Sequence, residues 1–492
     1  MTTLDPLPIS AETLSSRRAW TRALTLAERI AALRAGRLHL PDGGVPEAER
    51  RLGRWRAQAP FSEDRRWAER LAADGLAEAE LLGLLAGSAP DTGEAPRWWR
   101  ELEEACAFPR QDAGDAFDLD LGELAGFFAV VAPILAWKLA AVRERIAGLA
   151  AAPGPLPFNP EDVHRLILLA LPERLAGAVS RTLALELNVA RLEGRLRGET
   201  AAERFQSFVA ELTRPGGREA LFEEYPVLGR QVLHRADAWL DAGVEFLAHL
   251  KTDWPRIAET FAAGADPGPL TELQGGIGDR HRGREVLIAT FASGLRVVYK
   301  PRSMSADRHF QELLEWLDAH GQEPPLRAVA VLDAGPDRGW MEFVSQASCA
   351  SREEVHRFYR RQGSYLALLY AIQASDFHSE NLIAAGEQPV LIDLESLFQA
   401  RVGEMDVQNS GLLAAHALSR SVLEVGFLPQ RVWGDREREG VDLSGLGGVP
   451  GQRLPRPLPY WESAGTDSMV LGLRPEETAE GHNRPRLEGE EI

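Results

Sequence analysis

The chain has 492 residues, of which 45% are hydrophobic, and it carries a formal net charge of -18. This length is sufficient for two or three structural units, each with its own hydrophobic core. The acidic balance argues against nucleic acid or an anionic membrane as partner, because both need a basic protein surface.

The N-terminus, MTTLDPLPIS, lacks the basic start and apolar core of a signal peptide, so we expect a cytoplasmic protein. Only two cysteines occur, Cys106 and Cys349, and neither belongs to a CxxC pair. We therefore expect no disulfide framework and no zinc site built from cysteines.

Residues 1–264 are predicted to form a helical region, because Ala, Leu, Arg and Glu dominate and the apolar positions follow a helical spacing. Thr200 is expected to start one helix, since Glu203 three residues later completes a capping box. The longest apolar stretch, Leu121–Leu139, is interrupted by charged residues and a proline, whereas a membrane span needs ~20 largely apolar residues. We therefore predict a buried helix there and no transmembrane segment.

The composition changes near Gly264, and residues 265–345 are predicted to form a small lobe of strands with one helix. β-branched and aromatic residues mark the strands, and a short turn between the first two is typical of a hairpin. The predicted strands are 284–291, 295–300, 326–333 and 339–344, the predicted helix is 307–320, and a further strand is expected before Gly275.

Residues 346–492 are predicted to form a partial large lobe. Helical spacing returns at 352–373, and 389–398 has the pattern of a strand that runs into a loop. The tail after Arg401 is rich in Gly and Pro, so we expect it to be largely irregular. A long helical region, a small sheet with one helix and a mixed lobe together predict an α+β fold with a two-lobed C-terminal half.

The strongest chemical motif begins with Asp376 in DFHSEN and ends with Asp393 in VLIDLE. Phosphoryl transfer needs a carboxylate that orients the attacking hydroxyl and accepts its proton, a role that suits Asp376. Asn381 and Asp393 offer oxygen ligands of the kind that Mg²⁺ takes, and His378 can bind a phosphate oxygen or move a proton. Asp376 and Asn381 alone would be explained equally well by turn hydrogen bonds, but the following strand that ends in an aspartate favours a phosphoryl-transfer site.

A nucleotide needs a cation at its phosphates, and Lys300 ends the predicted strand 295–300. The carboxylate partner of this lysine is expected on the following helix, where Glu312 and Glu315 are both available and the sequence does not choose between them. Arg302 offers a second positive charge. A solvated lysine at the end of a strand is the alternative interpretation of Lys300.

A glycine-rich segment, GGIGDRH, precedes the hairpin and includes Gly276 and Gly278. Such a loop lets backbone N–H groups approach phosphates, although no GK[ST] follows as in a Walker A sequence. Asp279 and His281 are candidate catalytic residues at this loop, with stabilisation of the turn as the alternative. Glu342 marks the expected hinge at the end of the small lobe, whose backbone would bind adenine, with an ordinary buried strand end as the alternative.

Several segments resemble class II lanthipeptide synthetases in their dehydratase region. These segments are ELNVARLEGRLRGETAAERFQSF, EYPVLGRQV, GDRHRGREVLIATFASGLRVVYKPRSM, GWMEFV and SDFHSENLIAAGEQPVLIDLESLF. They are co-linear with the family from about residue 185 onward, whereas residues 1–184 match less distinctly. The spacing of the catalytic motif is similar to that of the lipid-kinase-like branch of the kinase superfamily, so we expect a two-lobed kinase-like core after the helical region.

The resemblance implies that ATP and Mg²⁺ are used to phosphorylate Ser and Thr of a ribosomal precursor peptide with leader and core parts. The same site would then eliminate phosphate to leave dehydroamino acids. By motif match, the resemblance assigns the kinase-like roles to Lys300, Asp376, His378, Asn381 and Asp393. Asp279 and His281 match a further family motif, and His378 and Arg302 are the local candidates for the elimination step.

The cyclase part of the family, with its zinc site of Cys and His ligands, has no counterpart in this sequence, so we expect no zinc and no cyclisation. Two further elimination residues of the family, an Arg and a Thr, are not matched either. We therefore expect an incomplete C-terminal lobe. Three interpretations stay open: a fragment, a kinase-only remnant, or half of a split system whose partner is a separate polypeptide with the remaining dehydratase and cyclase parts. A kinase-like enzyme for a lipid or small molecule, and a non-catalytic fragment that binds a peptide, remain open as alternatives.

Overall fold

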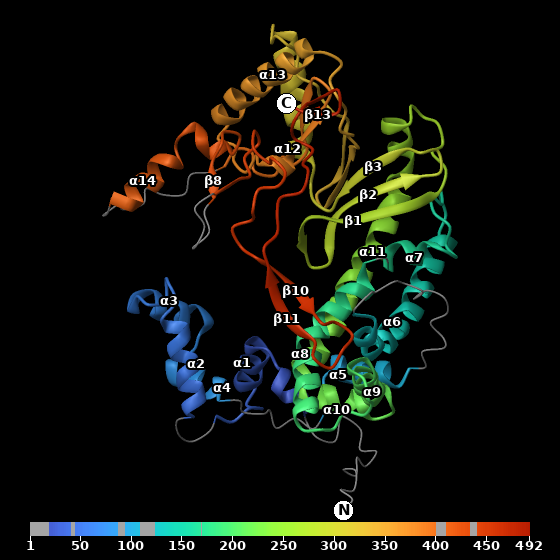
Figure 1. The fold of residues 1–492 in the computed structure, drawn as a ribbon, viewed down its shortest axis with the longest axis vertical. Helices are drawn as coiled ribbons and strands as arrows, with labels where there is room; N and C mark the ends of the chain where they lie inside the picture. The colour runs from blue at the N-terminus through green and yellow to red at the C-terminus, as the bar shows by residue number, and fades with distance from the viewer. Residues whose placement is uncertain are drawn as a thin grey trace, which may run out of the picture. The chain divides into compact units, whose positions relative to one another are not determined.

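The computed structural model describes residues 19–40, 45–86, 94–108, 124–168, 170–399, 410–432 and 440–492. Long helices and small antiparallel sheets are both present, which confirms the predicted α+β class (Figure 1). The chain divides into two compact units, while the predicted domain boundaries at residues 264 and 345 remain predictions. The first unit is Met1–Arg143, Ala170–Ala238 and Ala464–Met469, and the second is Glu144–Leu169, Trp239–Ser463 and Val470–Ile492.

Helices account for nearly all the regular structure before residue 262, as the sequence predicts. They are η2 (Ala19–Ala23), α1 (Leu26–Arg34), α2 (Pro46–Arg56), α3 (Asp64–Asp74), α4 (Glu78–Leu85), α5 (Arg97–Ala107), α6 (Ala125–Ala151), α7 (Val163–Leu168), α8 (Leu171–Leu192), α9 (Ala201–Thr213), α10 (Gly217–Glu224) and α11 (Pro226–Phe261). The break between α6 and α7 contains the segment APGPLPFNP, whose prolines and glycine do not continue a helix.

The apolar stretch around residues 121–139 forms much of α6 in its described part. By length and composition α6 is apolar enough to cross a membrane, but 67% of its most apolar window is buried inside the protein. Phe127, Val131 and Leu135 are among its fully buried side chains. This burial agrees with the predicted core helix.

Helix α9 begins at the predicted capping box. The hydroxyl of Thr200 accepts the backbone N–H of Glu203 at 3.2 Å, and the Glu203 carboxylate accepts the backbone N–H of Thr200 at 3.0 Å. Phe205, Phe208 and Val209 are buried on one face of the helix, so the cap stabilises a turn that is also packed.

The capping box gives a first testable prediction. We expect Thr200→Ala to lower the free energy of unfolding by about 1 kcal/mol, because the variant lacks the side-chain acceptor for a helix N–H. Thr200→Ser retains that acceptor and is expected to lose much less. Urea unfolding followed by circular dichroism measures both variants, and wild-type stability for Thr200→Ala would contradict a stabilising cap.

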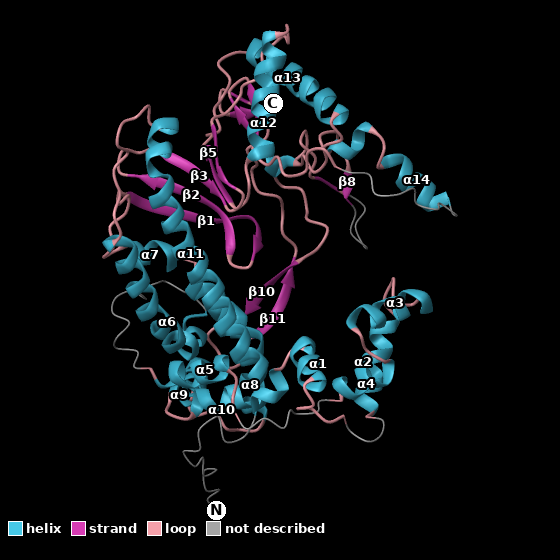
Figure 2. Ribbon diagram, turned by 180° about the vertical axis from the view of Figure 1, so that it is seen from behind, coloured by secondary structure: helices cyan, strands magenta, loops and turns pink. Residues whose placement is uncertain are grey.

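The second unit contains a five-stranded antiparallel sheet with the order β1-β2-β3-β5-β4. Its strands are β1 (Leu270–His281), β2 (Arg284–Phe291), β3 (Arg296–Lys300), β4 (Val331–Gly335) and β5 (Arg338–Glu342). Helix α12 (Ser305–Ala319) connects β3 to β4, which confirms the predicted sheet with one helix. The C-terminal half of α11 packs on the sheet (Figure 2), where the Phe246 ring lies 5.2 Å from that of Tyr299 and 5.9 Å from that of Trp340.

The fourth strand begins later than predicted. We expected it at 326–333, but strand pairing starts only at Val331. The reason is that side chains occupy the preceding backbone donors. The N–H of Val329 donates to the Gln311 side chain at 3.0 Å, and the N–H of Ala330 donates to the Glu342 carboxylate at 3.1 Å.

The glycine-rich segment is not a separate loop as predicted, because it lies within β1. The pairing of β1 with β2 shifts register between Gln274 and Ile277, which indicates a bulge. Gly276 has a φ of 88°, in the left-handed region that favours glycine. A Cβ atom on Gly275 would lie 2.2 Å from Oε1 of the buried Glu285, so a larger residue there would displace that carboxylate.

The remainder of the second unit is built around α13 (Arg352–Ala371) and a hairpin of β6 (Leu382–Ala385) and β7 (Gln388–Leu391). The predicted helix 352–373 and the strand before Asp393 are thus confirmed. The other elements are η5 (Ser379–Asn381), α14 (Ser410–Leu418), η6 (Val422–Val425), β8 (Arg431–Val432), β9 (Val441–Asp442), β10 (Leu458–Glu462), β11 (Val470–Arg474), β12 (Arg486–Leu487) and β13 (Glu490–Glu491). In its described residues the tail is mostly irregular, as predicted, but the hairpin of β10 and β11 was missed.

Candidate functional site

The segment 375–381 connects α13 to β6 and carries the predicted catalytic motif. The backbone N–H of Phe377 donates to Val425 O at 2.9 Å, and that of Ser379 donates to Leu443 O at 2.9 Å. Phe377 and Ser379 are buried, whereas Asp376 is exposed and His378 is half-buried. This alternation anchors the segment in the core and leaves the two candidate catalytic side chains outside it.

Asp376 has a φ of 67°, in the left-handed region that few residues other than glycine adopt. Aspartate and asparagine tolerate this region better than most residues, and such strained positions often occur at functional sites. The backbone carbonyl of Asp376 accepts a hydrogen bond from Nδ2 of Asn381 at 2.8 Å. The turn hydrogen bond that the sequence left open is therefore present as well.

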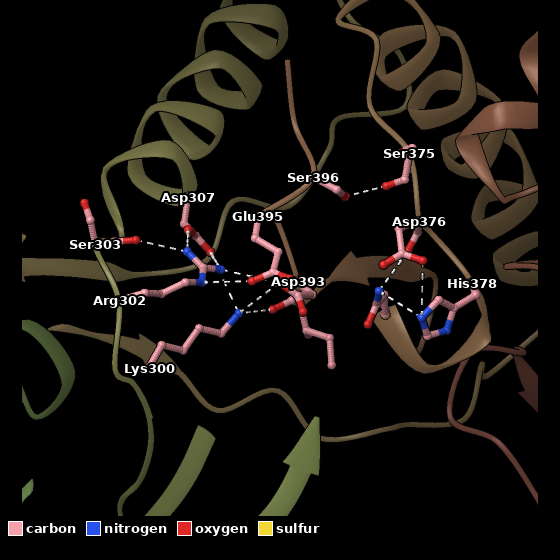
Figure 3. Close-up of polar contacts among 12 residues, drawn as sticks. Lys300, Arg302, Ser303, Asp307, Ser375, Asp376, His378, Asp393, Glu395 and Ser396 are labelled. Atoms are coloured by element: carbon pink, nitrogen blue, oxygen red, sulfur yellow. Dashed lines mark hydrogen bonds and ion pairs between the residues drawn. The ribbon is translucent and has the colours of Figure 1, made fainter. Parts of the chain in front are cut away.

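Asp376, His378 and Asn381 lie close together. His378 Nε2 is 3.8 Å from Asp376 Oδ1 and 3.3 Å from Asn381 Nδ2 (Figure 3). Because Nδ2 of Asn381 serves the turn, Oδ1 is the atom of this side chain that can act as a metal ligand.

Lys300 lies at the end of β3 and is only 5% exposed, which excludes the alternative of a solvated lysine. Its ammonium donates to the Ile392 carbonyl and lies 3.8 Å from Asp307 Oδ1 and 3.9 Å from Asp393 Oδ1. Burial lowers the pKa of Lys300 below its ordinary value, although Asp307 and Asp393 oppose that shift.

The carboxylate partner on the following helix is Asp307, not Glu312 or Glu315 as predicted. Asp307 is fully buried and forms two hydrogen bonds with Arg302, at 2.6 Å and 3.2 Å. Figure 3 shows Lys300 and Arg302 directed toward Asp307 and Asp393. Asp393 Oδ1 lies 3.4 Å from Arg302 Nη2, so the two cations and two carboxylates form one network.

The side of α12 that faces the core explains why the predicted partner of Lys300 was wrong. Asp307 shares the buried face of the helix with Phe310, Gln311 and Leu314, at the spacing of three and four residues that lies on one side of a helix. Glu312 falls outside this face and pairs with Arg308 and His309 at the surface. Glu315 is exposed too.

A cavity of about 510 Å³ brings most of the predicted site residues together. Six of them line it: Lys300, Arg302, Asp376, His378, Asn381 and Asp393. The cavity, which we call the phosphate cavity, therefore combines two cations, two candidate metal ligands and a candidate base. This donor set fits a nucleotide with Mg²⁺, because cations suit the phosphates and carboxylate and amide oxygens suit the metal.

Six further charged residues of the site were missed by sequence reasoning. Asp307 lies behind the phosphate cavity, and five others line it: Arg282, Arg284, Glu285, Glu380 and Glu395. Glu395 follows Asp393 by two residues, a spacing that could have indicated it, and its carboxylate lies 3.7 Å from Arg302 Nε. Arg284 donates two hydrogen bonds, at 2.6 Å and 2.7 Å, to the carboxylate of Glu245, which is distant in the sequence, so no local pattern reveals this pair.

Other predicted residues lie elsewhere or remain open. Glu342 is not among the described residues that line the phosphate cavity. Its carboxylate binds Arg327, and its backbone N–H donates to Ala330 O at 2.9 Å, so its hinge role stays a prediction. The side chains of residues 277–281, which include Asp279 and His281, lie outside the described part, and Gly278 lies within β1.

Comparison with known proteins agrees with the resemblance of the sequence motifs. Residues 225–492 match a family model described as Domain of unknown function (DUF4135), a range that contains the whole phosphate cavity. The chain is also 28% identical over 291 residues to the lacticin 481/lactococcin biosynthesis protein LcnDR2 of Lactococcus lactis subsp. lactis. That alignment covers 57% of this chain and 31% of the relative, so this chain spans about a third of the relative's length. Since the family match extends over more than half of the sequence, the chain belongs to the DUF4135 domain family and is a lanthipeptide synthetase-like protein.

Proposed function

We propose that this chain acts in lanthipeptide biosynthesis as a dehydratase that phosphorylates Ser and Thr of a ribosomal precursor peptide with ATP and then eliminates the phosphate. The observation that carries the proposal is the phosphate cavity, where Lys300, Asp376, Asn381 and Asp393 meet. The name of the relative, a lacticin 481 biosynthesis protein, supports a peptide substrate.

A kinase-like core of the lipid-kinase-like type is part of the proposal. It is supported by an antiparallel sheet in which β3 ends in a buried lysine and is followed by a helix that supplies the carboxylate partner. It is supported also by the loops after α13 and β7, which present Asp376 and Asp393 to that lysine's cavity. Phosphoryl transfer relies mainly on positioning and charge stabilisation, and these elements supply both.

In the transfer step, the peptide hydroxyl oxygen forms a bond to the γ-phosphorus while the bond from phosphorus to the bridging oxygen of ADP breaks. Asp376 accepts the hydroxyl proton, and Lys300 and Arg302 hold phosphate oxygens. Asn381 and Asp393 would hold Mg²⁺, which supplies positive charge to the phosphates.

In the elimination step, a base removes the α-proton, a carbon–carbon double bond forms, and the bond from the β-carbon to the phosphate oxygen breaks. His378 is the described candidate for the base, with Asp279 and His281 as further candidates. Arg302 stabilises the phosphate that leaves, because its guanidinium already faces the cavity in a fixed orientation.

Intact-mass measurement tests the proposal directly. The purified chain is incubated with ATP, Mg²⁺ and the precursor peptide of lacticin 481, the compound in whose biosynthesis the relative is named. We expect the peptide to gain the mass of one phosphate per modified residue and then to lose a net water. A peptide that gains no phosphate and loses no water, with a chain that binds ATP, would contradict the proposed function.

The burial of Lys300 predicts a pH dependence of nucleotide binding. Because its pKa is lowered in the free protein, the ammonium loses its proton at a lower pH than an exposed lysine would. Bound phosphates favour the charged form of Lys300, so nucleotide binding at alkaline pH should be accompanied by proton uptake. The affinity for the nucleotide should therefore fall as the pH rises. Calorimetry at about pH 9 in buffers of different ionisation enthalpy measures this uptake. Equal proton uptake by wild type and Lys300→Met would contradict the assignment.

A further inference from the structure

A second cavity adjoins the phosphate cavity in the second unit. It has a volume of about 830 Å³, within the size range of ligand-binding clefts. Asp376, His378 and Glu395 line both cavities, so the candidate base stands at their common boundary. We call this second space the acceptor cavity.

The two cavities differ in charge. Four cationic side chains line the phosphate cavity, Arg282, Arg284, Lys300 and Arg302, together with the carboxylates of Glu285, Asp376, Glu380, Asp393 and Glu395. Among the described residues that line the acceptor cavity there is no lysine or arginine, and its carboxylates belong to Asp376, Glu395 and Glu424. A polyphosphate therefore finds cationic partners in the first cavity, whereas the described lining of the second offers it carboxylates without a lysine or arginine.

The far wall of the acceptor cavity is fixed to the catalytic segment. Val425 and Leu443 accept the backbone hydrogen bonds of Phe377 and Ser379, and Leu443 itself lines the cavity. Gly426 also lines it, with a φ of 87°, and a Cβ there would lie 3.0 Å from the backbone nitrogen of Phe377. The wall that carries Glu424 is therefore positioned by the same residues that position Asp376.

The lining offers polar partners for an extended peptide. Ser375, Ser396, Gln399, Gln430 and Ser444 all line the acceptor cavity. Two of them are oriented by hydrogen bonds, because the Ser396 hydroxyl donates to Ser375 O and the Gln430 side chain donates to Leu423 O. Fixed amide and hydroxyl groups can pair with the main chain of a bound segment, whatever its sequence.

We infer that the acceptor cavity binds the hydroxyl-bearing segment of the peptide, and that Glu424 makes it select neutral or basic neighbours of the target Ser or Thr over acidic ones. This inference rests on the proposed function, since the phosphate cavity must hold the phosphoryl donor. Glu424 lies within η6 (Val422–Val425) and is exposed, so its carboxylate is available to a bound segment. Glu395 adds a second negative charge at the boundary. Acidic neighbours are disfavoured because like charges repel across a short distance.

A binding experiment tests the inference without requiring turnover. Fluorescein-labelled heptapeptides with a central serine carry two lysines, two glutamates or two alanines as neighbours of that serine. Their affinities for the full chain are measured by fluorescence anisotropy in low salt with Mg²⁺ and a non-hydrolysable ATP analogue. We expect the lysine peptide to bind about two- to fivefold more tightly than the glutamate peptide.

The variants separate the acceptor cavity from the acidic surface as a whole. Glu424→Gln should reduce the preference for the lysine peptide, and Glu424→Lys should abolish or reverse it. Glu259→Lys, an exposed position on α11 outside both cavities, makes the same change in net charge and should leave the preference as in wild type. Circular dichroism confirms that each variant is folded.

The inference is overturned if Glu424→Lys and Glu259→Lys change the preference equally, or if none of the peptides binds. Phosphorylation of the same peptides is scored separately by mass. Absence of phosphorylation together with a Glu424-dependent preference contradicts the proposed function but not the peptide-binding role of the cavity. If the peptides are phosphorylated but the preference for the lysine peptide does not change when Glu424 is replaced, the inference is contradicted and the proposed function is not.

Discussion

Replacement of Asp376 by asparagine is expected to slow peptide phosphorylation by about 10²–10⁴-fold, because the amide cannot accept the hydroxyl proton. Asparagine has nearly the same shape and also tolerates the positive φ of this position, so the local backbone should persist. The measurement is the initial rate of phosphate incorporation into the peptide under saturating ATP.

Nucleotide affinity supplies the control for this variant. Asp376 lies at the boundary of the two cavities and contacts His378, whereas Lys300 and Arg302 pair with Asp307, Asp393 and Glu395. Asp376→Asn should therefore bind an ATP analogue within a few-fold of wild type. Glu259→Gln, a carboxylate-to-amide change at an exposed position on α11, should keep both the rate and the affinity. An unchanged phosphorylation rate in Asp376→Asn would show that another group accepts the proton.

Replacement of Asp307 by alanine is expected to lower the free energy of unfolding by about 3–5 kcal/mol. The buried carboxylate binds Arg302 at 2.6 Å and lies 3.8 Å from the Lys300 ammonium. Its removal leaves two positive charges close together, with only Asp393 and Glu395 to compensate them. Chemical denaturation followed by tryptophan fluorescence measures the loss.

Glu312 provides the matched comparison for Asp307. Both carboxylates lie on α12, and Glu312 was one of the two residues, with Glu315, that the sequence offered as the partner of Lys300. Glu312→Ala removes only surface pairs with Arg308 and His309, so its unfolding free energy should stay within about 0.5 kcal/mol of wild type. If Asp307→Ala does not fold, Asp307→Asn, which keeps a hydrogen-bond acceptor, extends the comparison. Equal effects at positions 307 and 312 would contradict the buried network.

The parts of the site that the sequence revealed are those set by local rules. Asp376, His378 and Asn381 lie within one short segment, and Asp393 follows a recognisable apolar strand, β7, by two residues, so sequence spacing was enough to group them. The cap at Thr200 is equally local, because the two hydrogen bonds of its capping box join residues three positions apart. Lys300 followed from its place at the end of a strand.

The parts that the sequence did not reveal depend on long-range contacts or helix phase. The choice of Asp307 over Glu312 required knowledge of which face of α12 is buried. The wall of the acceptor cavity belongs to the tail, whose sequence has no helical or strand periodicity. This wall is held in place because the carbonyls of Val425 and Leu443 accept hydrogen bonds from the backbone of the catalytic segment. No pattern in the tail indicates which carbonyls meet Phe377 and Ser379, so Glu424 could not be placed from sequence.

The arrangement of Lys300, Asn381 and Asp393 around one nucleotide–metal site is most directly tested with Mn²⁺ in place of Mg²⁺. Electron paramagnetic resonance of Mn²⁺ measures how much of the ion the chain binds with and without ATP. We expect wild type to bind Mn²⁺ tightly only with ATP, and Asp393→Asn and Asn381→Ala to weaken that binding by about 10–100-fold. Glu259→Gln should match wild type. ATP-dependent Mn²⁺ binding that Asp393→Asn leaves unchanged, or its absence from wild type, would contradict a nucleotide–metal site in the phosphate cavity.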